Sequence, residues 1–347
     1  MAKRQKMSAF QLEDLPDEMI VKVFSYLKIG DLIHCGHVSK RMRQIWNVES
    51  LWQSVDFNDL DNGRGSKVQT DFIIFLLDKG CKYLNLRSVE LTGSLELDKL
   101  SKLKRLNLEE CNAKREVFEE ILYSCHSLEQ LSFQEVKPDQ DFDYHDVRKV
   151  ILQNSKSLKK INLGAFRWLK ATSKLNFFSH CQELTEVRIL GDLFEFDIDQ
   201  LDLMIDSFPP SLLKIDLSWC NTLTDFHIEK LARKCNKITE ISLWGTYVTN
   251  QSVINIVKHL KNSLELLDLT MCDNINLDNI FEAVGSLPKL KYLHYEVHTG
   301  SELPCNCSHI KKLCQSCERL KKECPGLFIM DESYFVIAMV DNYDYTD

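Results

Sequence analysis

The sequence lacks the features of membrane-embedded and exported proteins. No apolar run approaches the roughly 18 residues that a membrane-spanning helix needs. The opening segment MAKRQKMSAF has basic residues but no apolar stretch behind them, so no secretory signal is predicted. The 13 cysteines are an odd number in a chain of 347 residues. This count favours reduced thiols and a cytoplasmic or nuclear location over a disulfide scaffold.

The sequence also lacks an excess of positive charge and a recognisable catalytic motif. It has 43 Lys and Arg against 51 Asp and Glu, a net charge of −8, which argues against a protein built to hold nucleic acid. No serine lies in a nucleophile elbow, and no cysteine has an activating histidine motif. The segment NGRGSK, Asn62–Lys67, lacks the spacing of a phosphate loop and is typical of a flexible joint. The sequence therefore predicts neither an enzyme nor a bound cofactor.

One cysteine-rich segment near the C-terminus, CNCSHIKKLCQSC, leaves a zinc site open as the weaker alternative. Four thiolates can hold zinc tetrahedrally. The candidate ligands are Cys305, Cys307, Cys314 and Cys317. However, Ile310, Leu313, Cys314 and Cys317 also follow helical spacing, and buried free cysteine behaves as a small hydrophobic residue. We therefore predict no metal centre.

Most of the chain is a repeat of the pattern L-x-x-L-x-L. Eight copies begin at Leu103, Leu128, Leu158, Leu184, Leu212, Ile238, Leu264 and Leu290, and a weaker one begins at Cys81. The intervals between the eight are 25, 30, 26, 28, 26, 26 and 26 residues. Each copy predicts a short strand whose first, fourth and sixth residues point into a core. Segments between copies, such as 116–125 and 226–235, have helical apolar spacing. The chain is therefore expected to stack strand–turn–helix units into a parallel coil.

The segment 215–243 resembles the cysteine-containing leucine-rich repeat. Cys111, Cys220 and Cys272 occupy the Asn/Cys position that follows the strand in that family. The resemblance extends over roughly residues 76–330. It implies an α/β fold: a curved horseshoe with a parallel sheet on the concave face and helices outside.

The N-terminal part, residues 10–57, has no repeat and predicts three short helices. The first, Leu15–Leu27, carries two apolar stripes, which are Ile20, Phe24 and Leu27 and, beside them, Met19, Val23 and Tyr26. One stripe is enough to hold a helix on its own core. Because a unit this small buries little of its surface, leftover apolar surface predicts a partner site. The alternative is that this surface packs on the first repeat.

The segment from Leu15 to Phe57 resembles the F-box. It matches that family at Leu-Pro, at the turn from Phe24 to Leu27, at Asp31-Leu32, Val38-Ser39 and Leu51-Trp52; Met42 departs from the Trp that many members carry. The resemblance implies binding to an Skp-type adaptor that joins a cullin–RING ubiquitin ligase. It also implies adaptor contacts at Leu15, Pro16, Ile20, Phe24, Leu27, Leu32, Val38 and Trp52, whereas Ile45, Trp46 and Leu51 are expected to hold the helices together.

These patterns predict an F-box at 10–57, a linker at 58–75, about nine repeats at 76–333, and a C-terminal cap with an acidic tail at 334–347. The outward strand residues are expected to bind a target through aromatic and acidic side chains of the later repeats, since exposed aromatics are typical of interfaces. The candidates are Arg188, Asp216, Glu240, Trp244, Leu266, Asp268, Tyr292, His294 and Glu296.

The combination predicts a non-catalytic receptor that presents a protein substrate to an SCF-type ubiquitin ligase. Its expected partners are the adaptor, the cullin and RING protein reached through it, and an unidentified target. The alternative is a repeat-based scaffold that uses its F-box for assembly without directing degradation. The sequence leaves the target and any modification it requires open.

Overall fold

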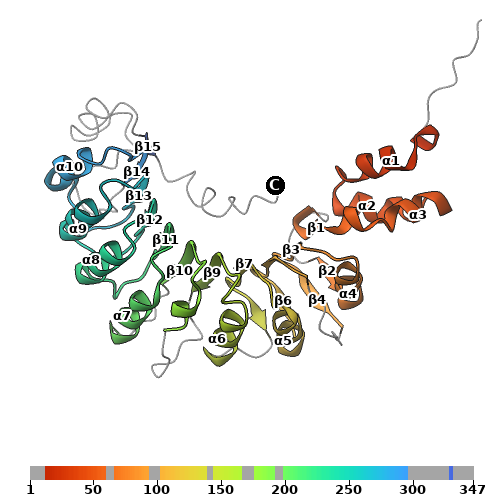
Figure 1. Cartoon of the computed structure of the whole chain (residues 1–347), viewed down its shortest axis with the longest axis horizontal. Coiled ribbons are helices and arrows are strands. Elements are labelled where there is room, and N and C mark those ends of the chain that lie inside the picture. The colour runs from red at the N-terminus through yellow and green to blue at the C-terminus, as the bar shows by residue number, and fades with distance from the viewer. Residues whose placement is uncertain are drawn as a thin grey trace, which may run out of the picture.

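The protein forms an open arc with strands on the inside and helices on the outside (Figure 1). The computed structural model describes residues 12–59, 66–93, 102–138, 144–165, 176–191, 198–295 and 328–330. A three-helix unit stands at the N-terminal end of the arc, and the repeats follow it in chain order. The predicted α/β horseshoe is confirmed.

The inner sheet has 11 strands in the described part of the chain, and all their pairings are parallel. They are β1 Ser54–Asp56, β3 Tyr83–Asn85, β5 Arg105–Asn107, β7 Gln130–Ser132, β9 Lys160–Ala165, β10 Glu186–Leu190, β11 Lys214–Asp216, β12 Glu240–Ser242, β13 Leu266–Asp268, β14 Tyr292–His294 and β15 Phe328–Met330. Each of the nine predicted copies contains one of these strands. The register aligns equal repeat positions, so that Lys214, Glu240, Leu266 and Tyr292 lie side by side.

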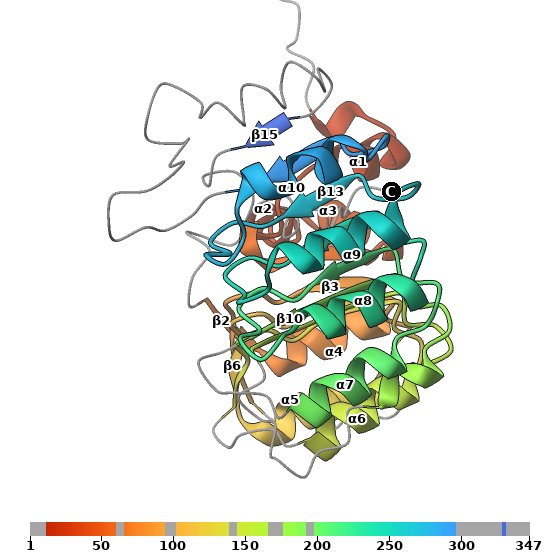
Figure 2. The same cartoon turned by 90° about the vertical axis from the view of Figure 1, so that its left-hand side faces the viewer.

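The helices of the repeats cover the outer side of this sheet (Figure 2). These are α4 Thr70–Asp78, α5 Arg115–Ser124, α6 Tyr144–Gln153, α7 Ile198–Ser207, α8 Asp225–Lys234, α9 Asn250–Leu260 and α10 Leu277–Gly285. The N-terminal unit contains α1 Asp17–Phe24, α2 Ile29–Cys35 and α3 Lys40–Trp46. Short 3-10 turns occur at Leu12–Asp14, Glu49–Trp52, Phe57–Asp59 and Phe177–His180. A second parallel sheet runs along the N-terminal repeats and contains β2 Lys67–Gln69, β4 Glu90–Thr92, β6 Asn112–Ala113 and β8 Lys137–Pro138.

The three predicted N-terminal helices are confirmed, with shorter bounds. The first ends at Phe24, because Ser25 onward turns rather than continuing to Leu27. The third begins after Ser39, whose Oγ accepts a hydrogen bond from the backbone N–H of Met42 at 3.1 Å, as its sequence position predicts. Among the described residues, none of the helices could span a lipid bilayer.

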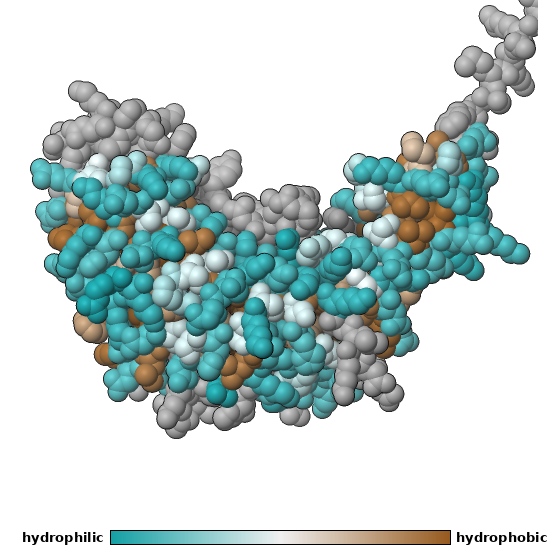
Figure 3. All heavy atoms as spheres, viewed as in Figure 1, coloured by the Kyte–Doolittle hydropathy of each residue, from teal (hydrophilic) through white to brown (hydrophobic). Residues whose placement is uncertain are grey.

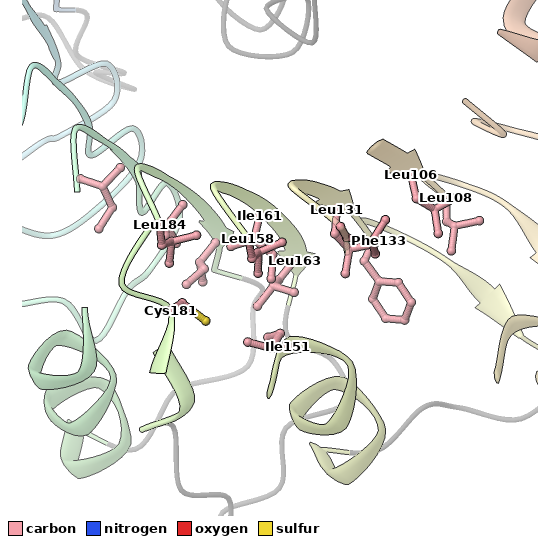
Figure 4. Packing of buried hydrophobic residues seen from close by; sticks show 14 of the residues in the cluster. Leu106, Leu108, Leu131, Phe133, Ile151, Leu158, Ile161, Leu163, Cys181 and Leu184 are labelled. Carbon is pink, nitrogen blue, oxygen red and sulfur yellow. The ribbon is translucent and has the colours of Figure 1, made fainter. Parts of the chain in front are cut away.

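The core lies between the sheet and the helices, and the repeat pattern supplies it. Figure 4 shows the leucines and isoleucines of successive strands side by side, with Ile151 of α6 beneath them. The skeleton residues of β11, β12 and β13 are fully buried, with no exposed surface. Since each repeat buries the face of its neighbour, the stack is cooperative and no single unit is complete alone.

Polar contacts between repeats reinforce this stacking. Asp225, the first residue of α8, caps the next helix: its carboxylate accepts hydrogen bonds from the backbone N–H groups of Thr249 at 2.9 Å and Ser252 at 3.1 Å. The thiols of Cys111 and Cys272 donate to carbonyls one repeat earlier, those of Val89 at 3.1 Å and Leu243 at 3.0 Å. The cysteine position of the repeat is therefore a buried hydrogen-bonding site.

An aromatic cluster joins the N-terminal unit to the first repeat. The ring of Trp46 stacks on that of Phe75 in α4 at 5.0 Å between centroids, and Trp52 meets Phe75 edge-on at 5.3 Å. Strand β1, at the end of the helical unit, pairs with β3 and so begins the inner sheet. The predicted linker at 58–75 is therefore wrong in extent, because β2 and the start of α4 lie inside it. Residues 60–65 and the predicted tail at 334–347 lie outside the described residues.

Candidate partner-binding surfaces

The two stripes of α1 differ in burial. Ile20 and Phe24 face the core and are 0% and 2% exposed. Met19, Val23 and Tyr26 face solvent and are 52%, 40% and 75% exposed; we call these three side chains the α1 stripe. Figure 3 shows a hydrophobic area on this N-terminal unit. The alternative that the second stripe packs on the first repeat is wrong for these three side chains.

The structure corrects the predicted adaptor contacts. Four of them are interior residues with at most 5% exposure, so they hold the helices together and offer no surface to a partner: Ile20, Phe24, Leu32 and Trp52. The indole N–H of Trp52 is used inside the unit, where it donates to the carbonyl of Trp46 at 2.7 Å. Pro16 and Val38 are exposed, and Leu15 and Leu27 are partly buried. The α1 stripe, whose helical spacing the sequence shows, is instead the exposed apolar surface of this helix.

On the concave face, basic side chains of the middle repeats are matched by carboxylates of the next strand. The ammonium group of Lys160 lies 3.0 Å from the carboxylate of Glu186, and that of Lys214 lies 2.9 Å from Glu240. Burial lowers the pKa of Lys214, but the hydrogen bond to Glu240 and the neighbouring carboxylates together raise it above its ordinary value. These pairs are worth little stability, but they cancel the positive charge that a phosphate group would need.

The fifth position of the repeat forms a buried polar ladder. Asp216 lies 3.1 Å from the guanidinium of Arg188, and Asp268 accepts a hydrogen bond from Ser242 at 2.9 Å. Burial, only partly offset by its hydroxyl and backbone donors, raises the pKa of Asp268 to about 6. Burial lowers the pKa of His294 to about 4. The ladder is therefore a buried polar part of the concave sheet, held by its own ion pairs and hydrogen bonds.

This ladder corrects part of the predicted target surface. Asp216, Asp268 and His294 are at most 5% exposed and cannot serve as docking groups. Tyr292 is 38% exposed, and Arg188, Glu240, Trp244 and Leu266 are partly exposed. Glu296 lies outside the described residues.

Two exposed aromatics in the segments that follow β11 and β12 were not predicted from the sequence pattern. Trp219 and Tyr247 are 38% and 60% exposed, and the Trp219 ring lies 5.6 Å from that of Trp244 between centroids. Gly245 makes this packing possible, because a Cβ there would lie 2.7 Å from the Trp219 ring. We call Trp219, Trp244 and Tyr247 the rim aromatics. Trp219 and Tyr247 fall at the eighth and tenth repeat positions, beyond the strand alternation used for the prediction.

The thiols at the cysteine position of the repeat are buried and only weakly acidic. Burial raises the pKa of Cys111 and Cys272 to about 12, so neither is a thiolate nucleophile at neutral pH. The eight described cysteines are all free thiols. Within the described ranges no three His, Cys, Asp or Glu side chains gather as metal ligands. The weaker zinc alternative at Cys305, Cys307, Cys314 and Cys317 lies outside those ranges.

Comparison with known families identifies the N-terminal unit. Residues 12–58 match the F-box-like family. This range ends within the 3-10 turn that follows β1, and it includes the α1 stripe. The F-box resemblance of the sequence is therefore confirmed for this unit.

Three solved structures illustrate the distant similarity of this chain to known structures. One chain of the yeast Rad7 and Elc1 complex is 14% identical, with a TM-score of 0.46, covering 91% of this chain and 93% of that one. An internalin (inlF) from Listeria monocytogenes is 15% identical, with a TM-score of 0.46, covering 80% of this chain and 74% of that one. A chain of the mouse RP105/MD-1 complex is 20% identical, with a TM-score of 0.44, covering 73% of this chain and 39% of that one.

Proposed function

Starting from a chain that joins an F-box-like unit to leucine-rich repeats, we propose that it is the substrate-recognition subunit of an SCF-type ubiquitin ligase. The N-terminal unit binds an Skp-type adaptor, and through it the cullin and RING protein. The repeats bind the target. The protein itself does no chemistry: it raises the local concentration of a target lysine near the ubiquitin-loaded enzyme.

The observation that carries this proposal is the α1 stripe on an F-box-like unit. Met19, Val23 and Tyr26 are large apolar or aromatic side chains with most or much of their surface in water. Val38, at 69% exposure, adds to the apolar surface of the same unit. Burying such side chains against a partner is favourable by roughly 25 cal/mol per Å² of apolar area. The adaptor is the partner that the F-box-like family supplies.

The target half of the proposal rests on the rim aromatics and the nearby strand residues Leu266 and Tyr292. Large aromatics supply much of the binding energy at interfaces. Because Lys160, Arg188 and Lys214 are already paired with carboxylates, this face favours a neutral or basic segment over a phosphorylated one.

The adaptor half is tested by co-purifying the full-length chain with an Skp-type adaptor. The double variant Met19→Asp/Val23→Asp places two charges in the α1 stripe, and we expect the adaptor Kd to rise at least thirtyfold, corresponding to about 2 kcal/mol. The matched control is Phe226→Asp/Ile254→Asp, which charges two exposed apolar residues of α8 and α9, 64% and 46% exposed. Unchanged adaptor binding by the stripe variant would refute the proposed interface.

The target half is tested by pull-down of cellular proteins with Trp244→Ala/Tyr292→Ala. Proteins that bind the wild-type chain and the Phe226→Asp/Ile254→Asp control, but not this variant, are the expected targets. If every bound protein is retained by the variant, the proposed concave surface is incorrect.

Degradation is separated from assembly by following those targets when the chain is depleted. The receptor proposal expects them to accumulate, with wild-type but not the stripe variant restoring their turnover. Relocation without accumulation would favour the scaffold alternative. Fluorescence microscopy of the tagged chain tests the proposed cytoplasmic or nuclear location, which the buried free thiols favour.

A further inference from the structure

Helix α1 is held in place less by its own sequence than by another helix. It has only eight residues, and its N-cap residue, Pro16, makes no side-chain capping hydrogen bond. A helix of this length is not stable alone in water. Two buried side chains, Ile20 and Phe24, anchor one face, while the opposite face carries the α1 stripe.

Arg41 of α3 binds the start of this helix with its whole guanidinium group. Nη1 donates to the carbonyl of Glu13 at 2.5 Å, and Nη2 donates to the carbonyl of Leu15 at 2.6 Å. Nε and Nη2 both donate to one carboxylate oxygen of Asp17, at 2.9 and 2.6 Å. The guanidinium therefore fixes three points of the chain that enters α1.

The geometry explains why an arginine occupies this position. Its five N–H donors form a rigid planar fork, so one side chain can reach several acceptors in a fixed arrangement. A lysine ammonium is a point charge on a flexible stem and cannot reproduce that fork. Carbonyl acceptors do not titrate, so two of the three anchor points do not depend on pH.

We propose that Arg41 is a positioning residue for adaptor binding: it docks the N-terminal end of α1 on α3 and so presents the α1 stripe in a binding-competent orientation. Because this rests on the proposed function, the test has one part that needs no adaptor. Arg41 itself contacts the entry of α1 and is not one of the stripe residues.

The adaptor-free part uses hydrogen exchange of the full-length chain. Arg41→Ala should speed exchange of the backbone amides of α1 at least tenfold while leaving those of β11 to β13 unchanged. Arg43→Ala is the matched control, because Arg43 lies on the same helix but donates to the carbonyl of Gly36 at 3.1 Å and contacts no residue of α1 by hydrogen bond. Arg41→Lys should give an intermediate result.

The adaptor part uses binding kinetics. If the docked fraction of α1 falls to about a tenth, the apparent Kd rises about tenfold. The loss should appear in the association rate, because the contacts of the bound state are unchanged. Arg43→Ala should bind like the wild type, and the fraction of active protein should be the same for all variants.

Three results would overturn the inference. Unchanged α1 exchange in Arg41→Ala would show that the guanidinium does not hold the helix. A faster dissociation rate with unchanged association would make Arg41 a direct contact. Equal effects of Arg41→Ala and Arg43→Ala would indicate general destabilisation. Wild-type binding by Met19→Asp/Val23→Asp would instead remove the proposed interface, whatever the exchange result.

Discussion

The N-terminal unit and the repeats treat their outward side chains in opposite ways. The helical unit leaves the α1 stripe in water, with Tyr26 at 75% exposure. The sheet of the repeats pairs its charges across strands, as Lys160 does with Glu186, and buries a polar ladder that includes Asp268. The first surface therefore leaves apolar side chains exposed, and much of the second is paired or buried within the sheet.

The difference follows from architecture. A unit of fewer than about 50 residues has too small an interior to bury both apolar stripes of one helix. In the solenoid each repeat is covered by the next, and a parallel register places complementary side chains in neighbouring strands. Among the described residues of the concave side, the rim aromatics and a few strand residues stay exposed, so under the proposed function a few residues should dominate target binding.

The largest expected effect comes from the core of the repeats, in contrast to the exposed α1 stripe. Leu217→Ala, in a fully buried skeleton position, should lower the free energy of unfolding by about 2–5 kcal/mol, because it removes packed methyl groups and leaves a cavity. Urea unfolding followed by circular dichroism measures this. A loss below about 1 kcal/mol would mean that the stack repacks freely around the missing methyl groups and that the core of the repeats is not rigid.

A pH effect of intermediate size comes from the buried ladder. The folded pKa of His294 is about 4, against an ordinary 6.5, so its stabilisation is complete above about pH 6.5 and lost as pH falls through about 4. His294→Asn should therefore remove an acid-induced loss of roughly 3 kcal/mol. The variant and the wild type are compared by urea unfolding at pH 7 and pH 4.

Asp268 acts with the opposite sign. Its folded pKa of about 6 lies above the ordinary 3.8, so its stabilisation is complete below about pH 3.8 and lost as pH rises through 6. In the His294→Asn background, stability should therefore rise as the pH is lowered from 7 to 4. A continued fall would show that other groups control acid sensitivity.

The inter-repeat cap should give a smaller effect. Asp225→Ala removes the carboxylate that accepts the N–H of Thr249, the N-cap residue of α9, and the N–H of Ser252 in its first turn. We expect a loss of about 1 kcal/mol in the free energy of unfolding. Asp273→Ala, an exposed carboxylate of the next repeat, is the control. Equal losses from both variants would indicate a charge effect rather than a cap.

The smallest expected effect sharpens the contrast most. Tyr26→Ala should change the free energy of unfolding by no more than about 0.5 kcal/mol, because the side chain is largely in water. The same variant should weaken adaptor binding. A large loss of stability would mean that Tyr26 belongs to the core of the helical unit. The α1 stripe would then consist of Met19 and Val23 alone.

The repeats were readable from sequence because the period is local. Each L-x-x-L-x-L copy yielded a strand, and the helical spacing at 116–125 and 226–235 yielded α5 and α8. Strands β1 and β15 were not predicted, since neither lies in a clear copy and each forms by pairing with a neighbour. For the same reason the predicted linker at 58–75 is too long, because β2 inside it forms by pairing with β4.

The sites were only partly readable. Alternation separated inward from outward strand residues but could not show that outward Asp216 and His294 are covered by their neighbours. Helical spacing revealed two stripes on α1 but not which one faces the core.

The sequence by itself determined the repeat, the three N-terminal helices and the excess of apolar side chains on the first of them, because these depend on spacing along one segment. Tertiary structure alone decided which stripe of α1 is exposed and that Arg41 reaches the entry of that helix from 24 to 28 residues away. It also decided which concave residues are covered. Such outcomes depend on how separate segments pack, and packing is set by the whole chain rather than by any local pattern.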